Sequence, residues 1–370
     1  MKYSLRTIAL ASVAIIALPV VSSADVTIGI AGPTTGSVAF LGEQQEIGAQ
    51  RAIADLNASG GVLGENVNAI MVDDACNAEQ AVAAAGQLVS AEVAFVNGHI
   101  CSGTSIAASS IYEAANIIMM SPASTNPRVT DEGGLNVYRV IGRDDDQAIV
   151  AAELIISEFS GNRIAIVAGT NSYASELAQG LNTELASRGV TPELSLTFET
   201  DSSSYDDLVG QLAGADIEVA YLISNSPSDM GLIALQAREA LPEIQFLSAD
   251  ALSGDDFLLV AGEAGEGALF TFGPDARILP EAAMVTEAIR TEEFYEPGGY
   301  TLYSYAVVQV WAQAAEIAGT FDQRGILIAL QNNEFDTVIG RIGFDENGDV
   351  TGIENFVIYE YGVETYTQRP

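Results

Sequence analysis

The chain has very few of the residues on which common enzyme and cofactor chemistry depends. Its only lysine is Lys2 and its only histidine is His99. Without a later lysine, the sequence excludes the Walker phosphate loop, Schiff-base catalysis and anchoring of pyridoxal phosphate, because each needs an ε-amine. A single histidine excludes multi-histidine metal sites and the HExxH motif. We therefore expect a protein that uses no cofactor and no metal ion.

Positive charge is also scarce. Of the 14 basic residues, Lys2 and Arg6 lie in the first 24 positions, which leaves 12 arginines against 50 acidic residues and a net charge of −38 for residues 25–370. We expect no nucleic-acid partner, because phosphate binding needs clustered cations. Repulsion between this many negative charges destabilises the folded chain, and dissolved salt screens that repulsion. The charge therefore favours a protein from a salt-rich habitat. The alternative, a GC-rich genome, explains the missing lysine but not the acidic excess.

The N-terminus has the composition of an export signal. Lys2 and Arg6 give it a positive start, residues 8–21 are apolar, and the small residues 22–24 end in a cleavage site. We expect the mature chain to begin at Asp25. No later apolar run approaches the roughly 18 residues that span a bilayer, and no cysteine follows the cleavage site to accept a lipid. These features predict an exported, soluble protein.

Short β-branched runs alternate with amphipathic stretches along the chain. The first series contains a strand over residues 26–30 and a helix over residues 43–57, and a second series begins with a helix over residues 147–159. Repeated βα units predict mostly parallel sheets covered on both faces. About 346 residues are too many for one compact core, so we expect two similar α/β lobes.

Three local patterns resemble known sites but lack an essential feature. Residues 144–146 are three aspartates at a predicted helix start, where carboxylates cap the helix more often than they bind metal. Residues 344–352 begin like a calcium loop, but Val350 stands where glycine is required. The pair at 347–348, Asn-Gly, predicts a hairpin turn there. The glycines within residues 29–36 lack the GxGxxG spacing of a dinucleotide site.

The stretch VNGHICSGTS, residues 96–105, contains the histidine and one of the two cysteines. His99 and Cys101 are two residues apart on a strand end and point the same way, so a thiol hydrolase remains open. Cys76, however, ends the preceding predicted strand, which we expect to be the neighbour of the Cys101 strand in a parallel sheet. The carboxyl ends of neighbouring strands can lie close enough for a bridge. In an exported chain this favours a disulfide. His99 would then pack or form hydrogen bonds at the strand end.

Small hydroxyl residues follow two successive predicted strands. Ser102 begins a predicted helix, and residues 103–105 leave backbone N–H groups uncovered, which is a ready site for a carboxylate. Residues 121–127, SPASTNP, repeat the arrangement and place Thr125 beside an exposed loop. Ordinary caps and turns have the same composition, so this pattern alone leaves both interpretations open.

Five segments in chain order resemble the leucine/isoleucine/valine-binding proteins of bacterial ABC importers. They are DDACNAEQAV, GHICSGTSIAASSIYE, MMSPASTNPRVT, RIAIVAGTNSYASELAQG and TVIGRIGFDENGDVTG. The resemblance implies a type I periplasmic binding protein, with two Rossmann-like α/β lobes on parallel-sheet cores, three hinge crossings and a disulfide between the paired cysteines. Lobe 1 would comprise residues 25–142 and 275–347, and lobe 2 residues 143–274 and 348–370.

The resemblance also implies roles for single residues on a bound amino acid. Ser102 and Thr125 would hold the ligand carboxylate through hydroxyl and backbone N–H groups. The Ala123 carbonyl and the Thr125 hydroxyl would accept hydrogen bonds from its ammonium, and Cys101 would line the wall. Tyr173, in a strand-to-helix loop of the second lobe, matches the family tyrosine that closes over the ligand.

Three further positions concern the charge and the side chain of the ligand. Asp250 stands where the family has a glutamate that pairs with the ammonium, so the charge is kept on an arm one methylene shorter. Leu41 occupies a position that is usually aromatic, and residues 224–231 lack the family's second-lobe tyrosines. Recognition of the α-amino acid backbone is expected to be intact. We expect an apolar side chain, since no basic residue in these segments would meet a second carboxylate.

The function that the resemblance implies is binding, not catalysis. A monomer would capture an L-amino acid, branched-chain or otherwise aliphatic, between its lobes and deliver it to an ABC permease in the inner membrane. The three crossings between the lobes would lie near Ile141, Gly273 and Asp349. The alternatives are a binding protein for another small carboxylate or amide, a ligand-sensing partner of a membrane receptor, and an exported thiol hydrolase.

Overall fold

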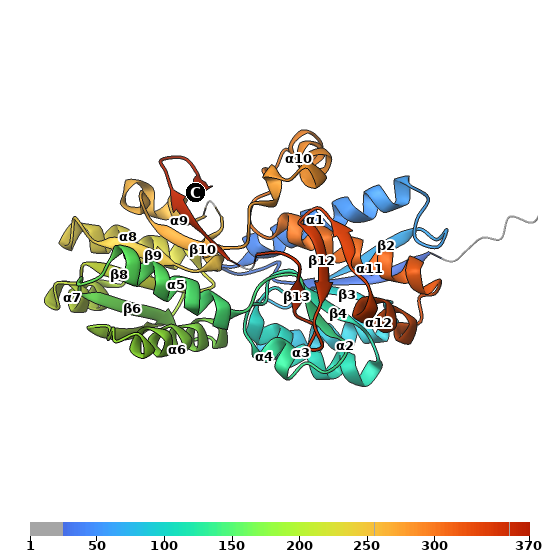
Figure 1. Cartoon of the computed structure of the whole chain (residues 1–370), viewed down its shortest axis with the longest axis horizontal. Helices are drawn as coiled ribbons and strands as arrows, with labels where there is room; N and C mark the ends of the chain where they lie inside the picture. The colour runs from blue at the N-terminus through green and yellow to red at the C-terminus, as the bar shows by residue number, and fades with distance from the viewer. Residues whose placement is uncertain (1–24, 255, 355) are drawn as a thin grey trace, which may run out of the picture.

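The computed structural model describes residues 25–254, 256–354 and 356–370. It consists of two α/β lobes that lie side by side along the long axis of the molecule (Figure 1). Each lobe is built on one mostly parallel sheet with helices on both faces, which confirms the predicted fold class. The predicted export signal, residues 1–24, lies outside the described residues. No helix among those described is both long and apolar enough to cross a membrane.

The first lobe contains a five-stranded parallel sheet in the order β2-β1-β3-β4-β5. Its strands are buried on both faces, as their continuous apolar runs require. Successive residues of β4 therefore serve different layers: Met119 packs with α2 and α3, and Met120 packs with α1 and α11. The strands are β1 (Val26–Gly32), β2 (Val67–Asp73), β3 (Val96–Gly98), β4 (Met119–Ser121) and β5 (Val137–Arg139).

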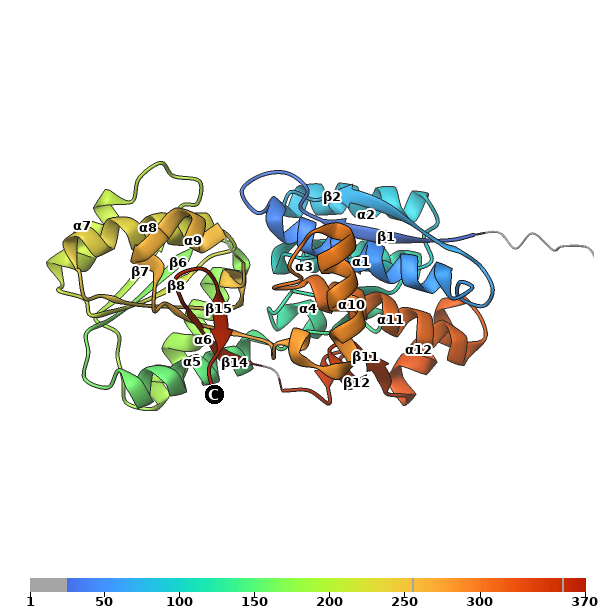
Figure 2. The same ribbon diagram turned by 90° about the horizontal axis from the view of Figure 1, so that it is seen from above.

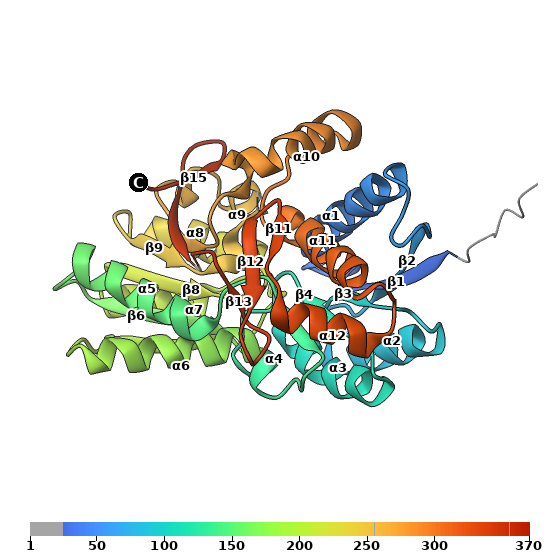
Figure 3. The same ribbon diagram turned by 45° about the vertical axis from the view of Figure 1, so that its right-hand side comes forward.

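Helices cover both faces of this sheet. The paired helices α1 and α11 pack on one face, and the paired helices α2 and α3 pack on the other. The helices of this lobe are α1 (Ala39–Ala58), α2 (Ala78–Ser90), α3 (Ser102–Ala115), α4 (Arg128–Asp131), α10 (Ala283–Ala288), α11 (Thr301–Ala318) and α12 (Gln323–Asn332). Figure 3 shows α10 standing away from both sheets.

The second lobe contains a seven-stranded sheet in the order β15-β14-β10-β9-β8-β6-β7, with antiparallel β14 and β15. Seen from above, these two C-terminal strands lie with the green and yellow lobe, away from α11 and α12 (Figure 2). The strands are β6 (Ile164–Gly169), β7 (Leu194–Phe198), β8 (Val219–Ile223), β9 (Gln245–Ser248), β10 (Leu269–Phe272), β14 (Val357–Tyr361) and β15 (Tyr366–Gln368).

Helices on one face of this sheet, α5 and α6, share a core that is separate from the core under α7, α8 and α9. The helices are α5 (Asp144–Glu158), α6 (Ser172–Ser187), α7 (Asp206–Gly214), α8 (Pro227–Ala240) and α9 (Asp256–Ala261). Short helical turns complete the chain: η1 (Asp250–Leu252), η2 (Gly262–Gly265), η3 (Ala276–Ile278), η4 (Pro280–Ala282) and η5 (Ile289–Glu293).

The C-terminal part of the chain also forms a small three-stranded antiparallel sheet. Its strands are β11 (Phe335–Thr337), β12 (Gly340–Phe344) and β13 (Val350–Thr351). The predicted turn at Asn347 and Gly348 connects β12 to β13, and Gly348 has a φ of 93°, which only glycine adopts without strain. The calcium-like spacing therefore belongs to a hairpin.

The structure corrects two expectations about order and boundaries. The strands that precede Cys76 and Cys101 are not neighbours, because β1 lies between β2 and β3. The helices begin earlier than hydrophobic periodicity indicated: α1 starts at Ala39, and α5 starts at Asp144, so the three aspartates form its first turn.

Candidate ligand-binding site

Both ring nitrogens of His99 form hydrogen bonds to buried side chains, so the imidazole is not free to act as a catalytic base. Its Nδ1 lies 2.6 Å from Asp74 Oδ2, and its Nε2 lies 3.1 Å from the Tyr112 hydroxyl. None of the three residues is exposed to solvent, and burial raises the pKa of Tyr112 far above its ordinary value. Since both imidazole nitrogens are engaged, His99 is a hydrogen-bonded strand-end residue, which is the role expected for it with a disulfide.

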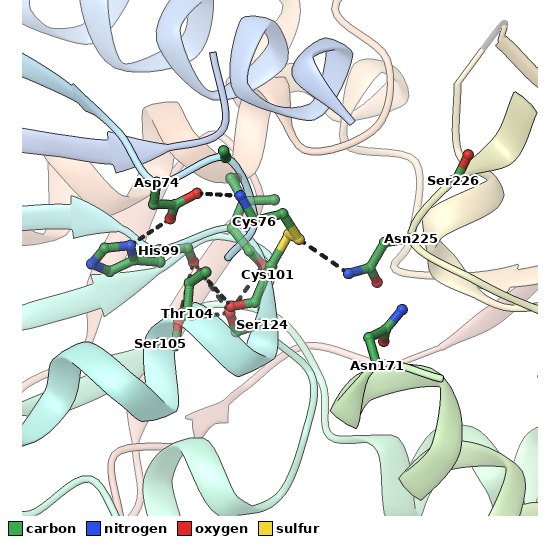
Figure 4. Close-up of a disulfide and its surroundings, with 12 residues drawn as sticks. Asp74, Cys76, His99, Cys101, Thr104, Ser105, Ser124, Asn171, Asn225 and Ser226 are labelled. Carbon is green, nitrogen blue, oxygen red and sulfur yellow. Dashed lines mark hydrogen bonds and ion pairs between the residues drawn. A yellow bond between two sulfur atoms is a disulfide. The ribbon is translucent and has the colours of Figure 1, made fainter. Parts of the chain in front are cut away.

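The two cysteines form the predicted disulfide, with 5.6 Å between their Cα atoms. The chain reaches across the end of β1 through a turn in which Ala75 and Cys76 have φ values of 45° and 53°. The Asp74 N–H donates to the Gly32 carbonyl at 3.2 Å, and its carboxylate accepts from the Cys76 N–H at 2.8 Å. Figure 4 shows Asp74 linking His99 to this turn. Neither cysteine is a free thiol.

Between the lobes, beside this disulfide, lies a small pocket with a cavity volume of about 20 Å³. It brings together all seven residues predicted to contact a ligand: Leu41, Cys101, Ser102, Ala123, Thr125, Tyr173 and Asp250. Four residues that the sequence did not indicate complete the lining: Ile100, Asn225, Ala251 and Tyr300.

The first-lobe wall of the pocket is the beginning of α3. Cys101 precedes the helix, and no side chain caps its first N–H groups. The Ser102 hydroxyl accepts a long hydrogen bond, 3.3 Å, from the Asn126 N–H. Uncapped N–H groups, the positive end of a 14-residue helix and nearby hydroxyls together favour a negative group.

Three serine hydroxyls hold the two segments of this wall together. Ser121 donates to the His99 carbonyl at 2.6 Å, and the hydroxyls of Ser124 and Ser105 lie 3.2 and 3.3 Å from the same oxygen and 2.8 Å from each other. Thr125, expected beside an exposed loop, is only 1% exposed because these bonds fold its segment inward. The serines therefore fix the Thr125 backbone relative to the start of α3.

Asp250 is the charged residue of the opposite wall. Its Oδ1 accepts hydrogen bonds from the Tyr173 hydroxyl at 2.7 Å and from Gln147 at 3.0 Å, and its Oδ2 accepts from the Tyr300 hydroxyl at 2.5 Å. Burial raises the pKa of Asp250, and these three donors oppose that rise because they stabilise the carboxylate. The same burial raises the pKa values of Tyr173 and Tyr300, so both phenols remain protonated donors.

Tyr173 lies in the first turn of α6, not in the preceding loop as expected. The helix begins early because Asn171 caps it, accepting from the Ala174 N–H at 2.9 Å. This places the Tyr173 ring at the carboxyl edge of the second sheet, where its hydroxyl reaches Asp250.

Tyr300 and Asn225 connect the lobes, and neither was found from the sequence. Tyr300 follows the glycines 298 and 299 just before α11, on the first-lobe side, and reaches Asp250 of the second lobe. Asn225 follows β8 and donates to the Cys76 sulfur at 3.2 Å, so it faces the disulfide across the cleft (Figure 4). The position of Asn225, in the loop that follows a parallel strand, could have indicated it, because ligands bind at the carboxyl ends of such strands.

Further contacts cross the cleft beside the pocket. Glu176 of α6 accepts from Asn126 at 3.0 Å and from Arg128 at 3.1 Å. The starts of α3 and α6 also face each other, since a Cβ atom on Gly103 would lie 3.0 Å from the Ser172 hydroxyl. The pocket is therefore enclosed by the two lobes in contact.

The chain is similar to known proteins in both sequence and structure. Residues 25–364 match the family model described as periplasmic binding protein. The chain is 37% identical over 357 residues to an amino acid binding protein of Pseudomonas aeruginosa, covering 96% of this chain and 95% of that protein. It is 36% identical to Leu/Ile/Val-binding protein homolog 1 of Brucella melitensis, covering 91% of each. A leucine-binding protein from Thermotoga maritima superposes with a TM-score of 0.85 at 25% identity, covering 93% of this chain and 98% of that one.

Proposed function

This chain belongs to the periplasmic binding protein family, and we propose that it captures an aliphatic L-amino acid between its lobes for an ABC importer. The observation that carries the proposal is the pocket itself. It has an uncapped helix start on one side and a buried carboxylate, Asp250, on the other. A zwitterion carries the two opposite charges that these walls favour.

In this proposal the α-amino acid backbone lies across the cleft. Its carboxylate accepts from the N–H groups and hydroxyls around Ser102 and Thr125, and its ammonium donates to the Ala123 carbonyl, the Thr125 hydroxyl and Asp250. Tyr173 covers the ligand from the second lobe. Tyr300 holds the Asp250 carboxylate in position. Both relatives described above are named for amino acids, which supports this class of ligand.

The ligand side chain would lie against the remaining lining residues. Leu41, Ile100 and Cys101 offer an apolar surface, which supports an aliphatic side chain. Asn225 adds an amide whose N–H group is directed at the Cys76 sulfur. No catalytic group is assigned, because Cys101 is in the disulfide and His99 is bonded to Asp74 and Tyr112.

The proposed cycle is closure of the two lobes around the ligand in the periplasm, followed by docking of the monomer on the permease. We place the chain crossings near Ile141, Gly273 and Asp349, between the segments that form the two sheets. Because the ligand contacts both lobes, it binds the closed arrangement better than the open one and shifts the population toward closure.

The test is calorimetry of ligand-free, refolded mature protein with free amino acids, simple carboxylates and amides. We expect an aliphatic L-amino acid to bind with a micromolar or lower Kd, about −8 kcal/mol or better. Its des-amino carboxylate is the matched control and should bind much more weakly. If a carboxylate or amide binds and every amino acid fails, the amino-acid assignment is wrong.

A further inference from the structure

Asp144 is a buried carboxylate that the proposed binding mode does not use. It is the first residue of α5 and only 3% exposed. Among the described residues (25–254, 256–354 and 356–370), no group donates a hydrogen bond of ordinary geometry to either of its carboxylate oxygens. The Thr125 hydroxyl lies beside it and stabilises its charge only in part. An ionised carboxylate without strong donors is costly at this depth.

The backbone places this carboxylate next to the pocket. The Asp144 N–H donates to the Thr125 carbonyl at 2.9 Å, and Thr125 lines the first-lobe wall. One helical turn later, Gln147 donates to Asp250, which lines the opposite wall. Residues three apart on a helix share a face. Asp144 therefore lies behind the pocket lining, next to Thr125 and on the helix face that carries Gln147, close enough to Asp250 for the two charges to interact.

The basic groups near Asp144 are already paired with other acids. Arg139 lies 2.6 Å from Asp349, and Arg143 lies 2.8 Å from Asp349 and 3.0 Å from Asp145. The titratable and charged groups that face Asp144 from the surrounding elements are Arg139, Arg143, Asp145, Asp146, Tyr173, Tyr221, Asp250 and Tyr300.

The two acids of this region differ in their donors. Burial raises the pKa of Asp144 well above its ordinary value, and the charge of Asp250 raises it further, while Thr125 and Arg139 oppose the rise. Asp250 has three strong donors that favour its ionised form. Of two neighbouring acids that share one proton, the one without donors retains it.

We propose that Asp144 belongs to the ammonium subsite, carries a proton beside ionised Asp250 in the empty protein, and releases that proton when the ligand ammonium binds. This inference rests on the proposed amino-acid function. The O–H bond of Asp144 breaks, the proton passes to solvent, and the ammonium charge takes its place, so the net charge of the ammonium subsite is unchanged. The negative charge of the ligand carboxylate is held separately, at the start of α3. Two carboxylates at one position also explain why a ligand without a cation would be rejected.

The proposal predicts the sign of the pH dependence. Protons compete with the ligand for Asp144, so affinity should increase as the pH rises. While Asp144 is protonated in the free protein and ionised in the complex, the association constant should rise by up to about tenfold per pH unit.

The experiment is calorimetry with L-leucine and L-alanine between pH 5 and 8, in buffers of different ionisation enthalpy, which counts the protons released. We expect up to about one proton released per ligand in the wild type. Asp144→Asn should release none and bind with nearly constant affinity across this range. Glu153→Gln, an exposed carboxylate further along the same helix, is the matched control and should behave as the wild type. A wild type without proton release, or an Asp144→Asn variant that still releases it, overturns the proposal.

A second measurement does not depend on a ligand. A raised pKa in the folded state means that folding binds a proton, so stability is lost as the pH rises above the unfolded value of about 4. Asp144→Asn removes this loss. Its Tm without ligand should exceed that of the wild type by a margin that grows from pH 4 to pH 8. An unchanged margin overturns the protonation of Asp144, whereas failure of all amino acids to bind overturns only the amino-acid function.

Discussion

At the scale of residues, the two walls of the pocket recognise charge in different ways. The wall at Ser102 consists mainly of backbone N–H groups at a helix start, which no single side-chain substitution removes. The carboxylate that lines the opposite wall is Asp250, which Tyr173, Gln147 and Tyr300 hold in position. Substitutions on the two walls should therefore have unequal effects on binding.

Asp250→Ala should weaken binding of an amino acid by about 2–5 kcal/mol, because the ligand ammonium would lose the carboxylate that lines the pocket. Ser102→Ala should cost less, about 1–2 kcal/mol, since the backbone donors remain. Calorimetry on both variants, with circular dichroism to verify folding, makes the comparison. An equal loss in the two variants would contradict the assignment of the ammonium to Asp250.

The sequence indicated the residues that recognise the amino-acid backbone better than those around its side chain. Ser102, Thr125 and Asp250 follow strands of parallel sheets, where such loops gather at one edge. Tyr300 precedes a long helix of the first lobe, far along the chain from the other lining residues, so its contact with Asp250 depends on how the lobes meet. The sequence around Tyr300 alone does not show how the two lobes meet.

At the scale of elements, the disulfide fixes the connection between β2 and α2 against the start of α3. The two cysteines predicted this bond correctly. The prediction that β2 and β3 are neighbouring strands was wrong, because β1 lies between them. Strand order is determined by packing across the whole sheet, which no local pattern shows. The left-handed turn at Ala75 and Cys76 provides the extra reach.

Denatured, unreduced mature protein should therefore contain no titratable thiol. The bond closes a loop of 25 residues, and in the chain-entropy model such a loop stabilises the fold by about 3 kcal/mol. A variant with both Cys76→Ser and Cys101→Ser should lose about this much in urea denaturation. Two free thiols in the unreduced protein would remove the disulfide and reopen the interpretation of Cys101 as a reactive residue.

At the scale of the whole molecule, ion pairs gather where the lobes meet. Asp349 accepts from Arg139 at 2.6 Å, from Arg143 at 2.8 Å and from Thr130 at 2.9 Å. These residues lie beside two of the proposed crossings. Glu176 adds the contact to Arg128 across the cleft. Three of the twelve arginines, Arg128, Arg139 and Arg143, are thus used where two parts of the chain are held together.

The remaining acidic excess is not compensated, and it predicts a strong response to salt. With 12 arginines against 50 acidic residues in the expected mature chain, repulsion between exposed carboxylates outweighs the surface ion pairs that salt would weaken, because such pairs contribute about 0–1 kcal/mol each. Raising NaCl to about 1 M shortens the screening length to about 3 Å, so the Tm at pH 7 should increase. The same series near the isoelectric point of about 4.1 is the internal control, where the increase should shrink because net repulsion is small there. A Tm that stays flat or falls with salt at pH 7 would mean that the acidic surface is no adaptation to salt, and would leave genome composition to explain the missing lysine.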